Sequence, residues 1–223
     1  MRRWICCVWV ILAFRAEAES DLRLELGGGY GVGSNSGVYD VNHGSLDLQS
    51  VTGGSGPVLT AGLWLDHVMT PRLSVGVDFL RLMNKATATL DLPKGISILT
   101  DPTTGRAKLS ATADMAFLDV AYRPVFTDPA VAFYVGGGIG GGTGKAGASF
   151  EIFNPATGGF SQQAAVNSPI GGAHGLMGVD FYLTKSMFIS LSPQILYITG
   201  HPVGVHQSYL DMIFTSSIGI YLD

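Results

Sequence analysis

Six charged residues stand in segments that otherwise alternate between apolar and small side chains. They are Arg23, Glu25, Asp78, Asp119, Arg123 and Asp180. Charged groups that leave water must be paired, because an isolated buried charge is very costly. If these side chains point into one enclosed space, they predict an ion-pair network there. The alternative is that Arg23 and Arg123 lie at a rim of the fold and meet water.

Asp114 complicates this pattern. It is separated from Asp119 by an odd number of residues, so the two side chains point to opposite faces of a regular strand. Only a β-bulge between them would let both point inward.

The glycine-rich segment matches nucleotide-binding motifs only in part. Gly136, Gly138 and Gly141 have the spacing of a dinucleotide-binding loop, but no helix pattern follows and no acid lies at the required distance. Lys145 ends a run that resembles a phosphate-binding loop, yet Ile139 occupies the leading glycine position and the hydroxyl residue after the lysine is missing. We therefore expect no nucleotide cofactor.

The histidines lack the neighbours that metal binding or catalysis needs. His201 and His206 share a short segment near Asp211, without a residue to orient either imidazole. Hydrolysis requires a histidine within reach of a serine or of a water held by an acid, and His174 has no such partner evident in the sequence. We predict no enzyme activity, no cofactor and no bound metal.

The first 18 residues have the features of a secretory signal peptide. Basic residues precede an apolar run from Trp4 to Phe14, and small residues for cleavage follow at Ala16 and Ala18. The run is much shorter than the roughly 20 residues of a spanning helix. We predict a signal peptide at 1–18 and one domain at 19–223. Both cysteines lie before the cleavage point, so the domain has no thiol for a disulfide, a metal or catalysis.

The composition of the chain favours a lipid-facing β-barrel. Charged residues make up 13% of the chain, against about 25% in soluble domains. No stretch in 19–223 approaches 18 apolar residues, so spanning helices are not expected. The other structure that can cross a bilayer is a closed barrel. The formal net charge of −4 makes nucleic acid an unexpected partner.

Alternation with period two predicts eight antiparallel strands, long enough to cross a bilayer when tilted. The expected ranges are 22–32, 57–67, 72–83, 109–123, 130–140, 170–183, 187–199 and 208–222. Tight turns are expected around Thr70, Thr127 and Thr184, which are spaced 57 residues apart. Polar stretches at 33–56, 84–108 and 141–169, and a shorter one at 200–207, are expected to be loops. Short turns at one end and long loops at the other are typical of outer-membrane barrels.

Each predicted strand has one oily face and one face of small or polar residues. Val75 and Phe79 oppose Ser74 and Asp78, for example, and Ile218 shares its face with other large apolar residues of the last strand. Soluble barrels place Lys, Glu and Arg outside, whereas Gly, Ser, Thr and single acids suit a narrow lumen. We therefore expect the oily faces to point outward into lipid. Aromatic residues near the strand ends are expected to form girdles at both interfaces, although the parity of Trp64 also allows it to point inward.

These segments resemble the small outer-membrane β-barrel family, which includes the transmembrane domain of outer-membrane protein A and the opacity-type surface antigens. The resemblance covers 19–223 and rests on LWLDHVMTPRLSVGVDFLRL, AFYVGGGIGGG, GVDFYLTKSMFISLSPQILY and FTSSIGIYL. It implies an eight-stranded up-and-down transmembrane barrel in the bacterial outer membrane, inserted by the barrel assembly machinery. Members generally end on an aromatic residue, whereas this chain ends Leu222-Asp223, which leaves the effect on assembly open.

The function expected from these features is structural, with a surface-interaction role carried by long loops on a rigid barrel. Expected partners are outer-membrane lipid and an unidentified extracellular ligand, and the chain is expected to be monomeric. Two other functions remain open: a small passive channel for ions or apolar solutes, and a soluble periplasmic binding barrel.

Overall fold

The protein is a closed antiparallel β-barrel. The computed structural model describes residues 21–41, 44–47, 55–92, 103–124, 130–154, 158–200 and 207–222. The strands are β1 (Asp21–Val41), β2 (Gly44–Asp47), β3 (Ser55–Asp66), β4 (Leu73–Leu92), β5 (Thr103–Tyr122), β6 (Val131–Asn154), β7 (Gly158–Tyr182), β8 (Met187–Gly200) and β9 (Gln207–Leu222). The signal peptide predicted at 1–18 lies outside the described residues, as do Thr127, His201 and His206.

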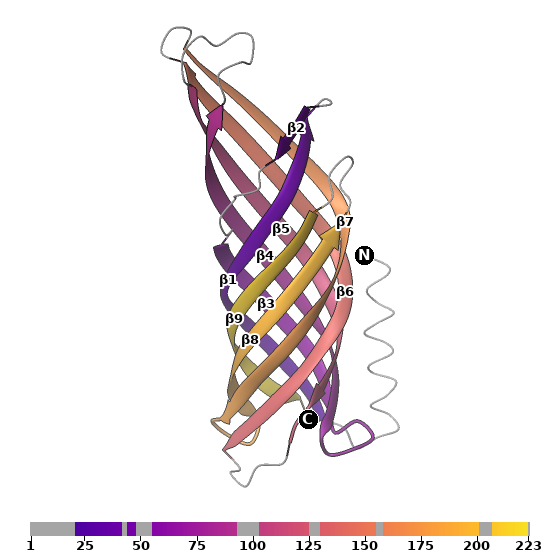
Figure 1. The fold of residues 1–223 in the computed structure, drawn as a ribbon. Coiled ribbons are helices and arrows are strands. Elements are labelled where there is room, and N and C mark those ends of the chain that lie inside the picture. Colours follow the sequence, from indigo (N-terminus) through magenta and orange to yellow (C-terminus); the bar gives the residue numbers. More distant parts are fainter. Residues whose placement is uncertain are drawn as a thin grey trace.

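Pairing between the first and last strands closes the barrel. Consecutive strands from β3 to β9 pair as neighbours, β1 pairs with both β3 and β9, and β2 adds a short hairpin to the far end of β1. Figure 1 shows the barrel strands running steeply around a common axis. This confirms the predicted eight-stranded up-and-down architecture. Among the residues described, no helix is both long and apolar enough to cross a bilayer.

Two of the predicted tight turns lie at one end of the barrel, which we call the turn end. His67 and Met69 adopt left-handed conformations there, with φ of 64° and 60°. The hydroxyls of Thr70 and Thr184 each accept a backbone hydrogen bond from the residue two positions later, so these threonines stabilise equivalent turns. Asp21 and Leu222 lie at the same end. The opposite end is the loop end.

The strands extend much further toward the loop end than the sequence predicts. β4, β5, β6 and β7 contain 20, 20, 24 and 25 residues. Much of the loops expected at 33–56, 84–108 and 141–169 is paired strand. These three predictions were wrong because the segments lack apolar alternation, whereas backbone pairing continues without it. Figure 1 shows these four strands rising beyond the rest of the barrel as a sheet.

The outer wall is apolar, as predicted. Met177, Ile189, Phe214 and Ile218 are 58%, 36%, 58% and 58% exposed, whereas inward-pointing residues such as Asp180 are buried. Val77 has outward parity but is buried in a cluster with Leu22, Leu65 and Val68. Apart from this cluster, the alternation predicts the two faces of the wall correctly.

An apolar layer crosses the lumen above the middle of the barrel, which the sequence did not predict. Leu80, Leu82, Met115, Phe117 and Ile213 belong to one buried cluster, together with Val58, Ala113, Leu196 and Ile198. They occupy positions that were expected to hold only small or polar groups. Since both faces of the wall are apolar at this level, alternation alone could not mark them.

Several glycines give lumenal aromatic rings the room they need. A Cβ at Gly76 would collide with the Trp64 indole, and one at Gly219 would collide with the Phe188 ring. Gly138, part of the apparent dinucleotide motif, lies in the middle of β6, where a Cβ would collide with the Asp119 carboxylate. These glycines therefore make space for packing, and no phosphate loop is present there.

Candidate functional site

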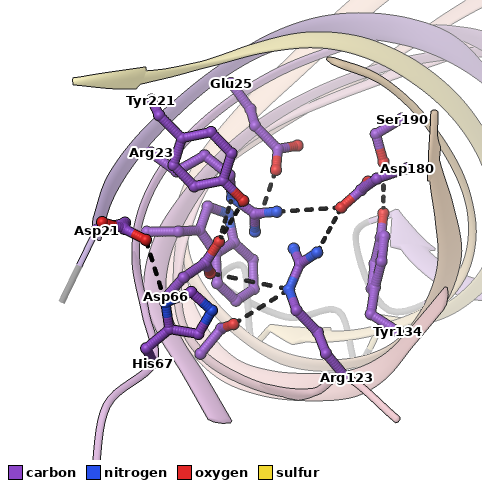
Figure 2. Close-up of polar contacts among 12 residues, drawn as sticks. Asp21, Arg23, Glu25, Asp66, His67, Arg123, Tyr134, Asp180, Ser190 and Tyr221 are labelled. Atoms are coloured by element: carbon purple, nitrogen blue, oxygen red, sulfur yellow. Dashed lines mark hydrogen bonds and ion pairs between the residues drawn. The ribbon is translucent and has the colours of Figure 1, made fainter. Parts of the chain in front are cut away.

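Charged side chains from distant strands meet in the lumen near the turn end. Arg23 on β1 reaches Glu25 at 3.2 Å, Asp180 on β7 at 3.3 Å and Asp66 on β3 at 3.6 Å. Its side chain is only 2% exposed. Figure 2 shows these groups converging on the barrel axis. Closure of the sheet makes this meeting possible, since β1, β3 and β7 contribute from different parts of the wall.

Arg123, just after β5, completes the cluster. Its guanidinium lies 2.5 Å from Asp180, 3.2 Å from the hydroxyl of Ser74 and 3.8 Å from Asp66. We call Arg23, Glu25, Asp66, Arg123 and Asp180 the charge cluster. Two cations thus face three carboxylates within a buried volume, so the cluster carries a formal excess of one negative charge.

Aromatic side chains surround the charge cluster. The Arg23 guanidinium lies 5.3 Å from the ring centroids of both Trp64 and Phe188, and that of Arg123 lies 5.2 Å from Tyr134. The Tyr221 hydroxyl donates to Asp66 at 2.9 Å. Tyr134, Phe188 and Tyr221 were candidates for the membrane girdle, and for them that prediction was wrong. For Trp64 the inward alternative holds. Their strand parity points these rings inward, where their π-faces and hydroxyls meet the arginines and Asp66.

A second polar layer lies between the charge cluster and the apolar layer. The Trp64 indole N–H donates to Asp78 at 3.1 Å. His174 Nε2 lies 2.5 Å from Asp119, its Nδ1 lies 3.2 Å from Gln194 Oε1, and its ring stacks on Phe117 at 4.4 Å. The imidazole is thus held on both nitrogens and on one face, which fixes its orientation.

The six residues singled out from the sequence all lie inside the barrel, in two groups. Arg23, Glu25, Arg123 and Asp180 belong to the charge cluster, where Arg23 and Arg123 are 2% and 9% exposed. The rim position considered for these arginines is therefore wrong. Asp78 and Asp119 belong to the second layer.

The structure shows to which face of the strand Asp114 points. Asp114 points outward, 3.3 Å from Arg81 on the neighbouring strand, and both side chains are about half exposed. The register between β4 and β5 is continuous through this pair, so no bulge is needed.

Two important lumenal residues were missed by the sequence analysis. Asp66 is 1% exposed and contacts both arginines of the cluster. Its parity with Trp64, which was allowed to point inward, was the available signal. His174 was judged to lack an acidic partner, which is wrong: Asp119, 55 residues away, supplies one across two strands.

The cavity among these groups is small. A lumenal cavity of about 40 Å³ is lined by residues including Arg23, Asp78, Tyr134, His174 and Gln194. Sites for small molecules usually measure about 300–1,000 Å³. The apolar layer closes the lumen on the side of the loop end, and beyond it Asn84 donates to Asp211 at 3.0 Å. In the described part of the chain, the lumen is filled by its own side chains.

The barrel is similar to solved structures of bacterial proteins. No protein-family model and no curated protein matches the chain. Neisserial surface protein A is 13% identical, with 90% of this chain and 97% of that chain covered and a TM-score of 0.48. The outer membrane protein OprG from Pseudomonas aeruginosa is also 13% identical, covering 91% and 96%, with a TM-score of 0.49. The outer membrane protease OmpT from Escherichia coli is 7% identical, covering 91% and 97%, with a TM-score of 0.42. Each likeness is one of fold.

Proposed function

We propose that this chain is an integral barrel of the bacterial outer membrane that holds a protruding sheet at the cell surface as an interaction element. The observation that carries the proposal is the contrast between its two parts. A barrel with an oily outer wall and a filled lumen supports four strands that continue far beyond that wall.

The outer wall fits a bilayer in chemistry and in height. On β8, exposed apolar residues run from Met187 to Tyr197, through Ile189, Leu191 and Ile195. That span matches the roughly 9–11 residues with which a tilted strand crosses a membrane. A soluble protein rarely exposes so continuous an apolar surface, because such a surface drives association in water.

The protruding sheet begins where the apolar wall ends. On β6 the last large apolar residue of the wall is Ile139, which is 71% exposed, and the strand continues to Asn154. β6 pairs with β7 along this whole extension, from Gly144 opposite Ser168 to Asn154 opposite Gly158. An ordered sheet outside the bilayer is a rigid surface for contact with other molecules. Since the tight turns at Thr70 and Thr184 lie at the turn end, we assign this end to the periplasm and the sheet to the outside.

A passive channel is the weaker proposal. Continuous conduction needs a wet path, whereas the apolar layer around Leu80, Phe117 and Ile213 seals the lumen. The charge cluster adds a second obstruction, because its groups are engaged with one another. We expect no single-channel steps when the purified protein is added to planar bilayers.

Insertion and sidedness are tested together by heat-modifiability and antibody labelling. An epitope is inserted between Asn154 and Gly158, at the tip of the sheet, and a control epitope between Thr184 and Met187, at the turn end. We expect unheated protein from the membrane fraction to migrate differently from heated protein, and only the first epitope to be labelled on intact cells. Recovery in the soluble periplasm, or labelling of the control epitope, would overturn the proposal.

The interaction role is tested by shortening the sheet. Lys85 is joined to Ser110, and Lys145 to Asn167, each through an Asn-Gly turn that suits a hairpin. We expect the shortened barrel to keep its heat-dependent migration, while cells that express it attach less to an epithelial monolayer than cells with the full chain. Equal attachment by both would remove the sheet from the function.

A further inference from the structure

We infer that the outer wall carries a binding site for a phosphate-bearing membrane lipid, at the junction between the apolar wall and the protruding sheet. The inference rests on the proposed membrane location. It draws on a hollow in the outer wall, on the cations beside that hollow, and on the height of both in the bilayer.

The hollow lies over β3, β4, β5 and β6. It measures about 610 Å³ and is open to the outside, and its lining includes Leu59, Ala61, Phe79, Arg81 and Asp114. We call it the outer groove. Its volume is within the range of small-ligand sites.

Small side chains flank Phe79 on the outer wall, and Ala61 and Phe79 themselves line the outer groove. Ala61, Phe79, Ala116 and Gly141 are consecutive partners across the four strands, all with outward parity. Three of these four positions hold alanine or glycine, so the wall is thin on both sides of the phenyl ring. Leu59 and Phe79 are 53% and 40% exposed. An apolar recess that faces lipid is suited to acyl chains, which fill it at no cost in desolvation.

One cation, Arg81, lines the groove, and two further cations lie beyond it toward the loop end. Ser110, Thr112 and Asp114 succeed one another on the outward face of β5. Lys85 on β4 is the partner of Ser110, and Lys145 on β6 is the partner of Thr112. We call Arg81, Lys85 and Lys145 the basic rim. Since directly paired residues lie about 5 Å apart, each lysine is adjacent to a residue of the β5 row that leads to Asp114.

Arg81 is placed to connect the groove and the rim. Arg81 lines the groove, its Nε lies 3.3 Å from the Asp114 carboxylate, and both side chains are about half exposed. Arg81 is opposite Asp114 in the register, and Thr143 is opposite Asp114 on the other side. These three residues are the first exposed polar groups above the apolar wall on their strands, so they stand at the level of lipid head groups.

The net positive charge of the basic rim favours a lipid with an anionic head group. Three cations and one carboxylate leave a formal charge of +2 at this site, in a chain whose net charge is −4. Phosphate has several acceptor oxygens for guanidinium and ammonium donors, and hydroxyls of Ser110 and Thr143 are available beside them. A molecule that places acyl chains in the groove and phosphate on the rim satisfies both parts of the site.

The test measures retention of a phosphorylated lipid by the folded barrel. The full chain is folded into phosphatidylcholine nanodiscs that contain a small fraction of lipid A with two phosphates. After release into mild detergent, native mass spectrometry gives the fraction of protein that carries the lipid. We expect lipid A to be retained at least ten-fold better than the same lipid without its phosphates. Equal retention of the two lipids would overturn the inference.

A pair of double variants tests the basic rim. Each basic residue near an anionic lipid contributes roughly a five-fold gain in affinity. Lys85→Gln with Lys145→Gln should therefore weaken retention about 25-fold. The matched control, Arg72→Gln with Lys185→Gln, removes the same charge from exposed positions at the turn end and should change nothing. Equal losses in both double variants, or no loss in the first, would contradict a local site.

Two further variants distinguish the ligand chemistry. Asp114→Asn removes the carboxylate that opposes an anion, so retention of lipid A should rise several-fold; a fall would indicate a head group with an essential amine. Ala61→Phe fills the groove and leaves every charge in place, so retention should fall about ten-fold. If it does not fall, or if inorganic phosphate displaces the lipid, the rim is a simple phosphate site and the groove has no role.

Failure of the inference is distinguishable from failure of the proposed function. Every variant is scored for heat-dependent migration before lipid is measured. If the barrel folds in nanodiscs but does not retain lipid A, only this lipid site is refuted. A chain that never shows the folded migration in any bilayer refutes the membrane location itself, and the lipid site with it.

Discussion

Replacing Arg23 by methionine tests whether the charge cluster holds the barrel together. The guanidinium contacts Glu25 at 3.2 Å, Asp180 at 3.3 Å and Asp66 at 3.6 Å, and its side chain is 2% exposed. Without it, Arg123 alone faces three buried carboxylates. Those groups are enclosed by the wall and the apolar layer, so water cannot readily take the place of the lost cation.

The expected cost follows from these contacts. Removing one partner of a buried ion pair costs about 3–5 kcal/mol, because the other partner is left uncompensated. Cation–π contacts with Trp64 and Phe188, both at 5.3 Å, add about 0.5–2 kcal/mol. The flexible methionine side chain recovers part of this by packing against the same rings. We expect the free energy of unfolding to fall by about 4 kcal/mol.

Asp180→Asn is the matched control. It has the same shape and the same buried position, but it removes one of three acids that face two arginines. The formal charges then balance, and the amide oxygen still accepts a hydrogen bond from Arg123. We expect a cost of about 1–2 kcal/mol, the value of weakened hydrogen bonds to charged groups.

Both variants are measured by urea unfolding of the full chain in phosphatidylcholine vesicles. The midpoint is followed by heat-dependent migration and, independently, by tryptophan fluorescence, to which Trp64 contributes from beside the cluster. Arg23→Met should unfold at a clearly lower urea concentration than Asp180→Asn. If the order is reversed, or if both variants lie within 1 kcal/mol of the wild type, charge balance in the lumen does not determine stability.

Further predictions concern packing, the seal of the lumen and the outer wall. Gly219→Val places a branched side chain on the Phe188 ring and should cost more than about 3 kcal/mol or prevent folding, as judged by loss of heat-dependent migration. Leu80→Ala with Leu196→Ala opens the apolar layer; ion flux through planar bilayers should then rise above that of the wild type, and unchanged flux would mean that the charge cluster alone blocks the lumen. Arg81→Gln breaks a half-exposed ion pair and should lower stability by less than about 1 kcal/mol in the same urea assay, so a larger loss would give that pair a structural role.

The sequence by itself determined the kind of wall this protein builds. A period of two is a local property, so which residues share a face of a strand follows from their order alone. The outward positions of Met177, Ile189 and Phe214 and the inward positions of Asp180 and Ser190 were predicted in this way. The number of strands, their order and two of the tight turns followed from the same pattern and from the spacing of threonines.

Only the tertiary structure decided which inward side chains meet. Asp66 finds Arg23 and Arg123, and His174 finds Asp119, because closure and register bring together positions that are distant along the chain. The apolar layer inside the lumen and the paired strands beyond the apolar wall were also hidden from the sequence. In both places the two faces of a strand are alike in polarity, so the sequence shows no alternation there. Alternation was the signal on which the prediction depended, and in these segments only the register with the neighbouring strands shows which residues are paired.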